Sequence, residues 1–257
     1  MDAQAIADEL VDGRGYALIE DAIPAALAAD ARRQILAQVE AAQGGPRAPA
    51  DERSLSIGHE RVLLVDQGPL FEELVQNPTI LAVAEALLGE DLTLSAFSAR
   101  VLMPGARPMG THVDYPYWAL PQPYALRPPL MMQVIWMMQD FTLDNGATFV
   151  APGSQLRTSP PNKELFGEEA IQITGRAGSA IVSHGLLWHD TAPNRTDVPR
   201  VAVLINYCNK VVRPMQDFSG LPDEALARAS PRLRRLLGKT FFEDLTSHLR
   251  PRTAAKG

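Results

Sequence analysis

Hydrophobic positions follow two different periods along this chain. Up to Gly89 they recur at the spacing of an amphipathic helix, interrupted by one short strand at Tyr16–Glu20. The helices expected in this part cover residues 2–12, 24–42, 69–76 and 78–88. Past Gly89 the apolar runs become short, which is typical of strands. The segments expected as strands there are 92–103, 111–118, 130–141, 148–151, 179–183, 186–189 and 200–208.

Glycine and proline separate these strands, most clearly at Pro104-Gly105 and Pro152-Gly153, and Asn145-Gly146 is a strong turn signal. A last helical pattern covers Asp223–Leu237. Helices come first and seven or eight short strands follow, without the alternation of a doubly wound fold. This order favours a mainly β fold, a double-stranded β-helix (jelly roll) with N-terminal and C-terminal supporting helices.

A chain of 257 residues is compatible with one large domain, and we expect residues 1–257 to form it. Its expected parts are helical support over about 1–90, a jelly-roll core over about 91–210 and a helical extension over about 211–249. Three segments are long for loops and are candidates for lids or binding loops. They are Gly44–Ile57, Leu120–Pro129 and Ser154–Glu168, while the tail Arg250–Gly257 is expected to be disordered.

Composition narrows the possible partners. The net charge of −6 and the pI near 5.4 argue against nucleic acid and against an anionic membrane surface. No run of eighteen apolar residues is present, which predicts no membrane span. The first residues carry acids and no basic region, so no secretory signal is expected. The single cysteine, Cys208, can form no internal disulfide, which favours a reducing cytoplasm.

Candidate chemistry lies in His112-Val113-Asp114, followed much later by His189 and then Arg200. Alternate side chains of a strand share a face, so His112 and Asp114 can reach one metal ion together. Two imidazoles and one carboxylate form the facial triad of non-haem Fe(II) sites, which leaves positions open for a chelating cosubstrate and O2. A structural zinc site would be closed by four ligands, often cysteines, and one cysteine cannot supply them.

Each piece also has an ordinary structural interpretation. A His-x-Asp tripeptide arises by chance, His189 fits a hydrogen-bonded core position, and Arg200 fits a surface cation. His184 competes with His189 as the third ligand, but the eleven-residue gap to Arg200 favours His189, and His184 is then expected to support a ligand or to pack in the core. The two remaining histidines, His59 and His248, are expected at the surface.

From Gly15-Tyr16 to about Gly238, the chain resembles the phytanoyl-CoA dioxygenase family of Fe(II)/2-oxoglutarate oxygenases. The motifs that carry the resemblance are His112-Val-Asp114, Trp136–Gly146, Pro152-Gly-Ser154, Trp188-His189, Asn194–Arg200 and Val212–Asp217. The resemblance implies a jelly roll with the metal between its sheets. It implies His112, Asp114 and His189 as iron ligands, and Arg200 with Thr191 as partners of the distal carboxylate of 2-oxoglutarate. Gln155 departs from the pattern, because the family commonly has histidine there.

The implied activity uses Fe(II), 2-oxoglutarate and O2 to oxidise a small organic molecule, in the manner of bacterial enzymes of secondary metabolism. Related halogenases replace the carboxylate ligand by a small residue, so Asp114 favours hydroxylation of an unactivated C–H. Desaturation, epimerisation and cyclisation stay open within the enzyme class. A jelly-roll binding or structural protein with a vestigial metal site is the alternative outside it.

Four further residues are candidates for contacts in the site. Tyr115, Tyr117 and Trp118 follow the first ligands and are expected either to line a substrate pocket or to pack in the jelly roll. Strand alternation would turn Tyr115 and Tyr117 away from the ligands, unless the chain bends at Pro116. Gln133, a lone amide in an apolar run, is expected to contact the cosubstrate, with a substrate contact or a structural role as alternatives.

Overall fold

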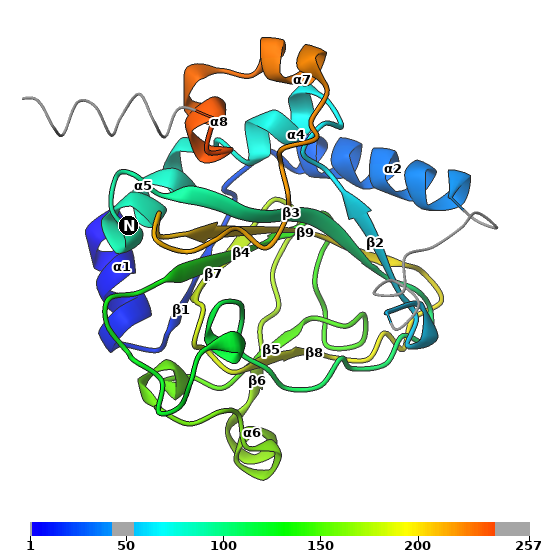
Figure 1. Ribbon diagram of the computed structural model, residues 1–257. Helices are drawn as coiled ribbons and strands as arrows, with labels where there is room; N and C mark the ends of the chain where they lie inside the picture. Colours follow the sequence, from blue (N-terminus) through cyan, green and yellow to red (C-terminus); the bar gives the residue numbers. More distant parts are fainter. Residues whose placement is uncertain (1, 43–53, 240–257) are drawn as a thin grey trace, which may run out of the picture.

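The computed structural model describes residues 2–42 and 54–239 (Figure 1). Several sequence-based expectations lie outside these residues. They concern most of the Gly44–Ile57 loop, the end of the C-terminal helical extension, His248 and the tail Arg250–Gly257.

Two antiparallel sheets form the core of the protein. The strands of the large sheet run in the order β1 (Tyr16–Ile19), β7 (Ala180–His184), β4 (Met131–Met137), β9 (Arg200–Cys208), β3 (Thr93–Leu102) and β2 (His59–Leu63). Those of the small sheet run in the order β6 (Ile171–Gln172), β5 (Thr148–Val150) and β8 (His189–Thr191). The small sheet lies opposite one face of the large sheet (Figure 1), and the sheets do not close into a barrel within the described residues. The predicted jelly-roll class is confirmed.

Helices cover the other face of the large sheet (Figure 1). They are α1 (Ala3–Asp12), α2 (Ala25–Ala41), α4 (Pro69–Leu74), α5 (Pro78–Leu88), α7 (Asp223–Arg228) and α8 (Pro231–Leu236). Apolar side chains alternate between the two faces of the large sheet along β4, so both faces need a layer that covers them. Val134 and Trp136 pack into the core on the helical side, while Ile135 and Met137 pack toward the small sheet. Burying each such side chain stabilises the fold by roughly 1.5–3 kcal/mol.

Local signals explain where α5 begins and ends. The Asn77 side chain accepts hydrogen bonds from the backbone N–H groups of Thr79 and Ile80, and Pro78 occupies the first turn. Gly89 ends the helix with a φ of 91°, a conformation that favours glycine. The predicted helix at 78–88 is therefore confirmed at both ends.

The structure differs from the predicted elements in several places. Strand β2 was missed, because its alternation is blurred by charged residues. The helical pattern at 223–237 forms two helices, since Pro231 begins α8 and Ser230 caps it. The presumed loop at 154–168 contains a 3₁₀ turn and most of helix α6 (Lys163–Glu169), whose N-cap is Asn162. The strand expected at 186–189 begins instead at His189, because residues 184–187 form a turn.

Across residues 2–42 and 54–239, no helix combines the length and the apolar character that a membrane span requires.

Candidate functional site

The segment with the first two ligand candidates lies against the chain leading into β8. His112 and His189 exchange both backbone hydrogen bonds at 3.1 Å, and the Asp114 N–H donates to the Gly185 carbonyl at 2.9 Å. The pairing consists of an isolated bridge and one further bond, so the expected regular strand at 111–118 is wrong. The bridge nevertheless places the two histidines directly opposite one another.

Donor atoms of His112, Asp114 and His189 all lie within 4.8 Å of one another. The His189 Nε2 and Asp114 Oδ1 atoms are 3.8 Å apart, too far for a direct hydrogen bond. The Nδ1 atom of His112 donates to the Gly110 carbonyl at 2.8 Å, and that of His189 donates to the Leu187 carbonyl at 2.9 Å. A carbonyl only accepts, so each Nε2 is left with a lone pair for a metal.

The protonation states of His112, Asp114 and His189 also favour a bound cation. Burial lowers the pKa of His112 and His189, which keeps both rings neutral and able to ligate. Burial raises the pKa of Asp114 to about 6, and its Oδ2 atom has no hydrogen-bond partner among the described residues. A buried carboxylate oxygen without a donor is satisfied by a bound cation. Two imidazoles and one carboxylate fit Fe(II) better than a closed zinc site.

Asp190 anchors the segment that precedes His112, a role that the sequence analysis missed. Its Oδ1 atom accepts the N–H groups of Met109 and Gly110, both at 3.1 Å, and that of Thr191 at 2.7 Å. Burial raises the pKa of Asp190, although these hydrogen bonds oppose the shift. Because Gly110 in turn orients the His112 ring, Asp190 positions a ligand without contacting its side chain. Its place directly after His189 was the available signal.

Arg200 is buried at the start of β9 beside this centre. Its Nη2 atom donates to the Gly146 carbonyl, and its guanidinium lies over the Phe141 ring, 4.5 Å from the centroid. Burial, and secondarily the charge of Arg100, lower the Arg200 pKa to about 9. The buried Nε–H has no partner within the part of the chain that the structure describes. A buried guanidinium with an unused donor is a site for a carboxylate.

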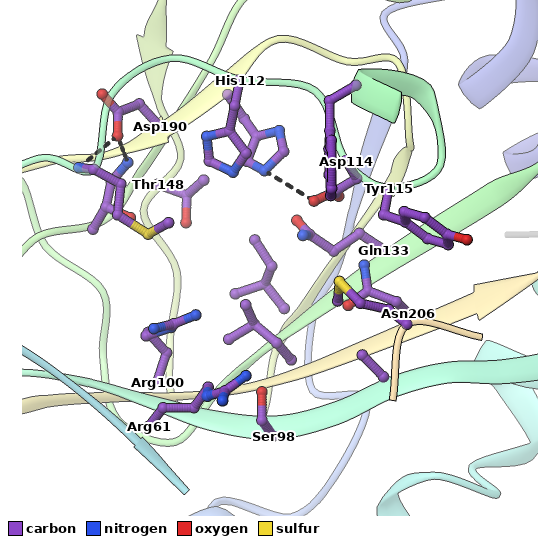
Figure 2. Close-up of a pocket in the computed structure, with 18 of the residues that line it drawn as sticks. Arg61, Ser98, Arg100, His112, Asp114, Tyr115, Gln133, Thr148, Asp190 and Asn206 are labelled. Atoms are coloured by element: carbon purple, nitrogen blue, oxygen red, sulfur yellow. Dashed lines mark hydrogen bonds and ion pairs between the residues drawn. The ribbon is translucent and has the colours of Figure 1, made fainter. Parts of the chain in front are cut away.

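A cavity of about 220 Å³ joins the triad to Arg200 (Figure 2). Thr148 and Thr191, which are opposite one another on β5 and β8, both line it. Arg61 and Arg100, paired across β2 and β3, line it as well. Arg61 was missed as a site residue, whereas Arg100 stands out in the sequence as the one charge inside the apolar run 92–103. Both arginines also make interactions with the protein.

The three aromatic candidates separate in the structure. A turn closes with a hydrogen bond from the Tyr117 N–H to the Asp114 carbonyl at 2.9 Å, so the chain bends at Pro116. Tyr115 and Trp118 line the cavity. Tyr117 is fully buried elsewhere, and its hydroxyl accepts the Leu130 N–H at 2.8 Å. The structure thus brings two of the three to the site.

Two other polar side chains line the cavity from the large sheet, Gln133 on β4 and Asn206 on β9. They are directly opposite one another in the strand register. Gln133 was a candidate from the sequence, whereas Asn206 was missed within an apolar strand.

Three residues noted in the sequence lie elsewhere. His184 stacks on Tyr117 and accepts the Leu186 N–H at 3.0 Å, and burial lowers its pKa to about 4. The expectation of a surface position for His59 is wrong, since it is fully buried and donates to the Arg107 carbonyl at 2.7 Å. Gln155 is buried and donates to the Gly13 carbonyl at 2.9 Å, which ties the N-terminal segment to the core.

Known proteins resemble this chain in sequence and in fold. "Dioxygenase af480" of Aspergillus fumigatus is 34% identical over 173 residues, which are 65% of this chain and 54% of the relative. The chain thus spans about half the length of that relative. The crystal structure of the epimerase SnoN, in complex with Fe3+, alpha ketoglutarate and nogalamycin RO, has a TM-score of 0.66 at 20% identity. That comparison covers 89% of this chain and 94% of SnoN.

The carbocyclase SnoK from nogalamycin biosynthesis has a TM-score of 0.61 at 22% identity, over 89% of this chain and 90% of its own. At these identities the two solved structures establish the shared fold. Residues 11–202, most of the chain, match the model of the phytanoyl-CoA dioxygenase (PhyH) family. The protein therefore belongs to the phytanoyl-CoA dioxygenase family.

Proposed function

We propose that this enzyme hydroxylates an unactivated C–H bond of a small organic molecule in secondary metabolism. His112, Asp114 and His189 hold the iron, and Arg200 with Thr191 binds the distal carboxylate of 2-oxoglutarate. The observation that carries the proposal is the common cavity. The triad lines one part of this cavity with two neutral histidines and the buried Asp114 carboxylate. Buried Arg200 also lines it, and its Nε–H has no partner among the described residues.

Some residues of the site position the ligand side chains, and others bind by their charge. When bound, iron and 2-oxoglutarate together supply the oxidising chemistry with O2. Arg200 would bind the distal carboxylate of the cosubstrate and so orient it, and burial would strengthen this interaction because water does not compete. The backbone carbonyls of Gly110 and Leu187 hold the imidazoles in the ligating tautomer. The cavity walls keep the reacting C–H close to the metal and away from bulk solvent.

The choice of hydroxylation depends on Asp114 and on the relatives. A carboxylate ligand occupies the position that a halide would need. The relative from Aspergillus fumigatus is called a dioxygenase, which supports oxygenation. SnoN is an epimerase and SnoK is a carbocyclase, both from nogalamycin biosynthesis. These two structural neighbours support secondary metabolism and keep epimerisation and ring closure as alternatives on the same centre.

We place the reaction in the cytoplasm. The support is the single cysteine, Cys208, which is free, because a chain without an internal disulfide suits a reducing compartment.

The test begins with anaerobic Fe(II) enzyme titrated with 2-oxoglutarate. We expect a saturable metal-to-ligand charge-transfer band, and we expect succinate to form once O2 and a substrate are supplied. Product mass then separates hydroxylation, which adds one oxygen atom, from desaturation or ring closure, which remove two hydrogens, and from epimerisation, which changes no mass. An enzyme that binds iron but never consumes 2-oxoglutarate would instead be a binding protein with a vestigial site.

A further inference from the structure

The cavity at the metal centre has two chemically different ends (Figure 2). Arg61 and Arg100 lie at one side of it, and Gln133 and Asn206 lie at the other. On β9, Arg200 and Asn206 both line the cavity but are six residues apart, a rise of about 20 Å along a strand. A cosubstrate held by Arg200 therefore occupies the arginine end and leaves the amide end open.

Gln133 is the best evidence for a ligand at the amide end. The side chain is 4% exposed, and its Oε1 atom has no hydrogen-bond partner anywhere in residues 2–42 and 54–239. Leaving a buried acceptor unpaired is costly, so a donor from a bound molecule would satisfy it. Asn206, directly opposite, donates to the Met131 sulfur at 3.4 Å, a weak acceptor that a better one can replace.

The inner cavity is too small for a complete substrate. Its volume of about 220 Å³ is below the roughly 300–1,000 Å³ of sites for drug-sized ligands, and it must also hold the cosubstrate. A second, open cavity of about 580 Å³ adjoins it at the amide end. Tyr115, Trp118, Met215 and Gln216 line both cavities, so a molecule that reaches the metal can extend outward between them.

The shared wall presents an apolar and aromatic surface. Trp118 is 61% exposed and Met215 is 52% exposed, which is unusual for side chains of this size. The Tyr115 and Trp118 rings are 5.8 Å apart and tilted by 59°, so they form a corner for a flat molecule. Phe218 and Leu237 continue this apolar wall in the outer cavity, which Arg213, Asp217 and Lys239 also line.

We propose that the substrate is a large, flat, largely apolar molecule with a hydrogen-bond donor near the oxidised carbon. The donor, a hydroxyl or N–H group, binds the Gln133 Oε1 atom, while the apolar body lies against Tyr115, Trp118 and Met215 in the outer cavity. This inference rests on the proposed function, because it takes the arginine end as the cosubstrate site. It assigns Gln133 to the substrate and not to the cosubstrate.

The apolar part is tested with N-phenyl-1-naphthylamine, a neutral aromatic fluorophore, titrated into anaerobic enzyme loaded with Fe(II) and 2-oxoglutarate. We expect saturable binding that weakens about ten-fold in Trp118→Ala, since a stacked aromatic contact and its buried area are lost. Leu143→Ala is the matched control, because Leu143 is also 61% exposed but does not line either cavity. Equal affinities in wild type and Trp118→Ala, or no saturable binding to wild type, would overturn the apolar assignment.

The donor part is tested by competition of 1-naphthol and 1-methylnaphthalene against that fluorophore. The two competitors share a ring system, but only 1-naphthol offers an O–H donor. We expect wild type to prefer 1-naphthol about ten-fold, because a buried acceptor discriminates against a ligand that leaves it unpaired. Gln133→Met should lose the preference. Ser183→Ala should keep it, since Ser183 is opposite Gln133 in the register but does not line the cavity.

The charge-transfer band separates this inference from the proposed function. A Gln133→Met variant with an unchanged band and an unchanged 2-oxoglutarate affinity is folded at the site, and the competition result then decides. A loss of 2-oxoglutarate affinity in this variant would place Gln133 in the cosubstrate site and overturn the inference. A wild-type enzyme without any charge-transfer band would contradict the proposed function itself.

Discussion

The two sheets of this protein differ in the length of their strands and in how they are packed. The large sheet has long ladders and is packed on both faces, by helices on one side and by the small sheet on the other. The small sheet has strands of only two or three residues, yet β8 supplies His189 and the adjoining bridge supplies His112. Regular packing thus secures the fold, while the ligand geometry depends on a few side-chain and backbone hydrogen bonds.

Removing a ligand is the strongest way to test this division. We expect His189→Ala to reduce turnover by at least about 1,000-fold, because the metal loses one of three ligands. The circular dichroism spectrum should stay that of wild type, since the large sheet is untouched. Turnover and iron content are measured together. Retained activity in His189→Ala, with loss in a His184 variant, would make the ligand assignment wrong.

Truncating a buried side chain of the large sheet should instead lower the stability of the fold. Trp136 is fully buried between β4 and the helical layer, and Trp136→Ala should lower the free energy of unfolding by about 3–5 kcal/mol. Urea denaturation of the metal-free protein measures this loss. Val211→Ala, at a position that is 77% exposed, is the control and should change stability by less than about 0.5 kcal/mol. Equal stabilities of the two variants would refute the role of the large sheet.

Arg200 lies on the large sheet but is proposed to bind the cosubstrate, so its substitution tests whether this residue serves binding or stability. Arg200→Lys keeps the charge and loses the planar fork. We expect 2-oxoglutarate affinity to fall about ten- to a hundred-fold, which corresponds to a charge-assisted hydrogen bond of roughly 1.5–3 kcal/mol. Iron binding should stay nearly unchanged. Unaltered cosubstrate affinity in the anaerobic charge-transfer titration, with altered stability, would show a structural cation instead.

Asp190 tests whether the small sheet positions the metal through its backbone anchors. Asp190→Ala removes the acceptor that holds the Met109 and Gly110 N–H groups. We expect iron affinity to fall about ten- to a hundred-fold, as for other residues that support a ligand indirectly. Asp190→Asn should restore most of the affinity, because its carbonyl still accepts. A purely structural role would change stability in both variants and leave iron affinity as it was.

The smallest expected effect concerns pH and His184, at the end of β7. Burial, together with the charge of Arg127, holds the His184 pKa at about 4, below its usual value of 6.5. The unfolded chain therefore binds the proton first as pH falls, and stability decreases from pH 6.5 toward 4. Between pH 6.5 and 5.5, metal-free wild type should lose about 1 kcal/mol more than His184→Asn. Parallel pH profiles of the two proteins would contradict this assignment.

Much of the helical layer and the large sheet was predictable because the signals are local. Gly89 marks both the end of α5 and the change of period, and β9 matches the segment predicted at 200–208. Asn145 was expected to serve in a turn, and its side chain does bond the Thr142 N–H and the Asp140 carbonyl. That turn connects the two sheets, which local signals cannot reveal.

Errors concentrate where distant segments meet. Strand alternation left two orientations open for Tyr115 and Tyr117, and the chain takes the alternative with a bend at Pro116, so Tyr115 and Trp118 reach the cavity and Tyr117 does not. His59 was placed at the surface because nothing nearby in sequence shows that β2 pairs with β3. Arg61 was missed for the same reason.

The sequence by itself determined the chemistry available to this protein: a His-x-Asp pair, a later histidine and an arginine in a mainly β chain. These are properties of residue type, order and period, which need no knowledge of distant contacts. Tertiary structure alone decided that Arg61 and Arg100 share a cavity with Arg200, and that Gln133 meets Asn206 at its other end. Strand register and burial are set by long-range packing, so the division of the cavity into two ends appears only once the sheets have formed.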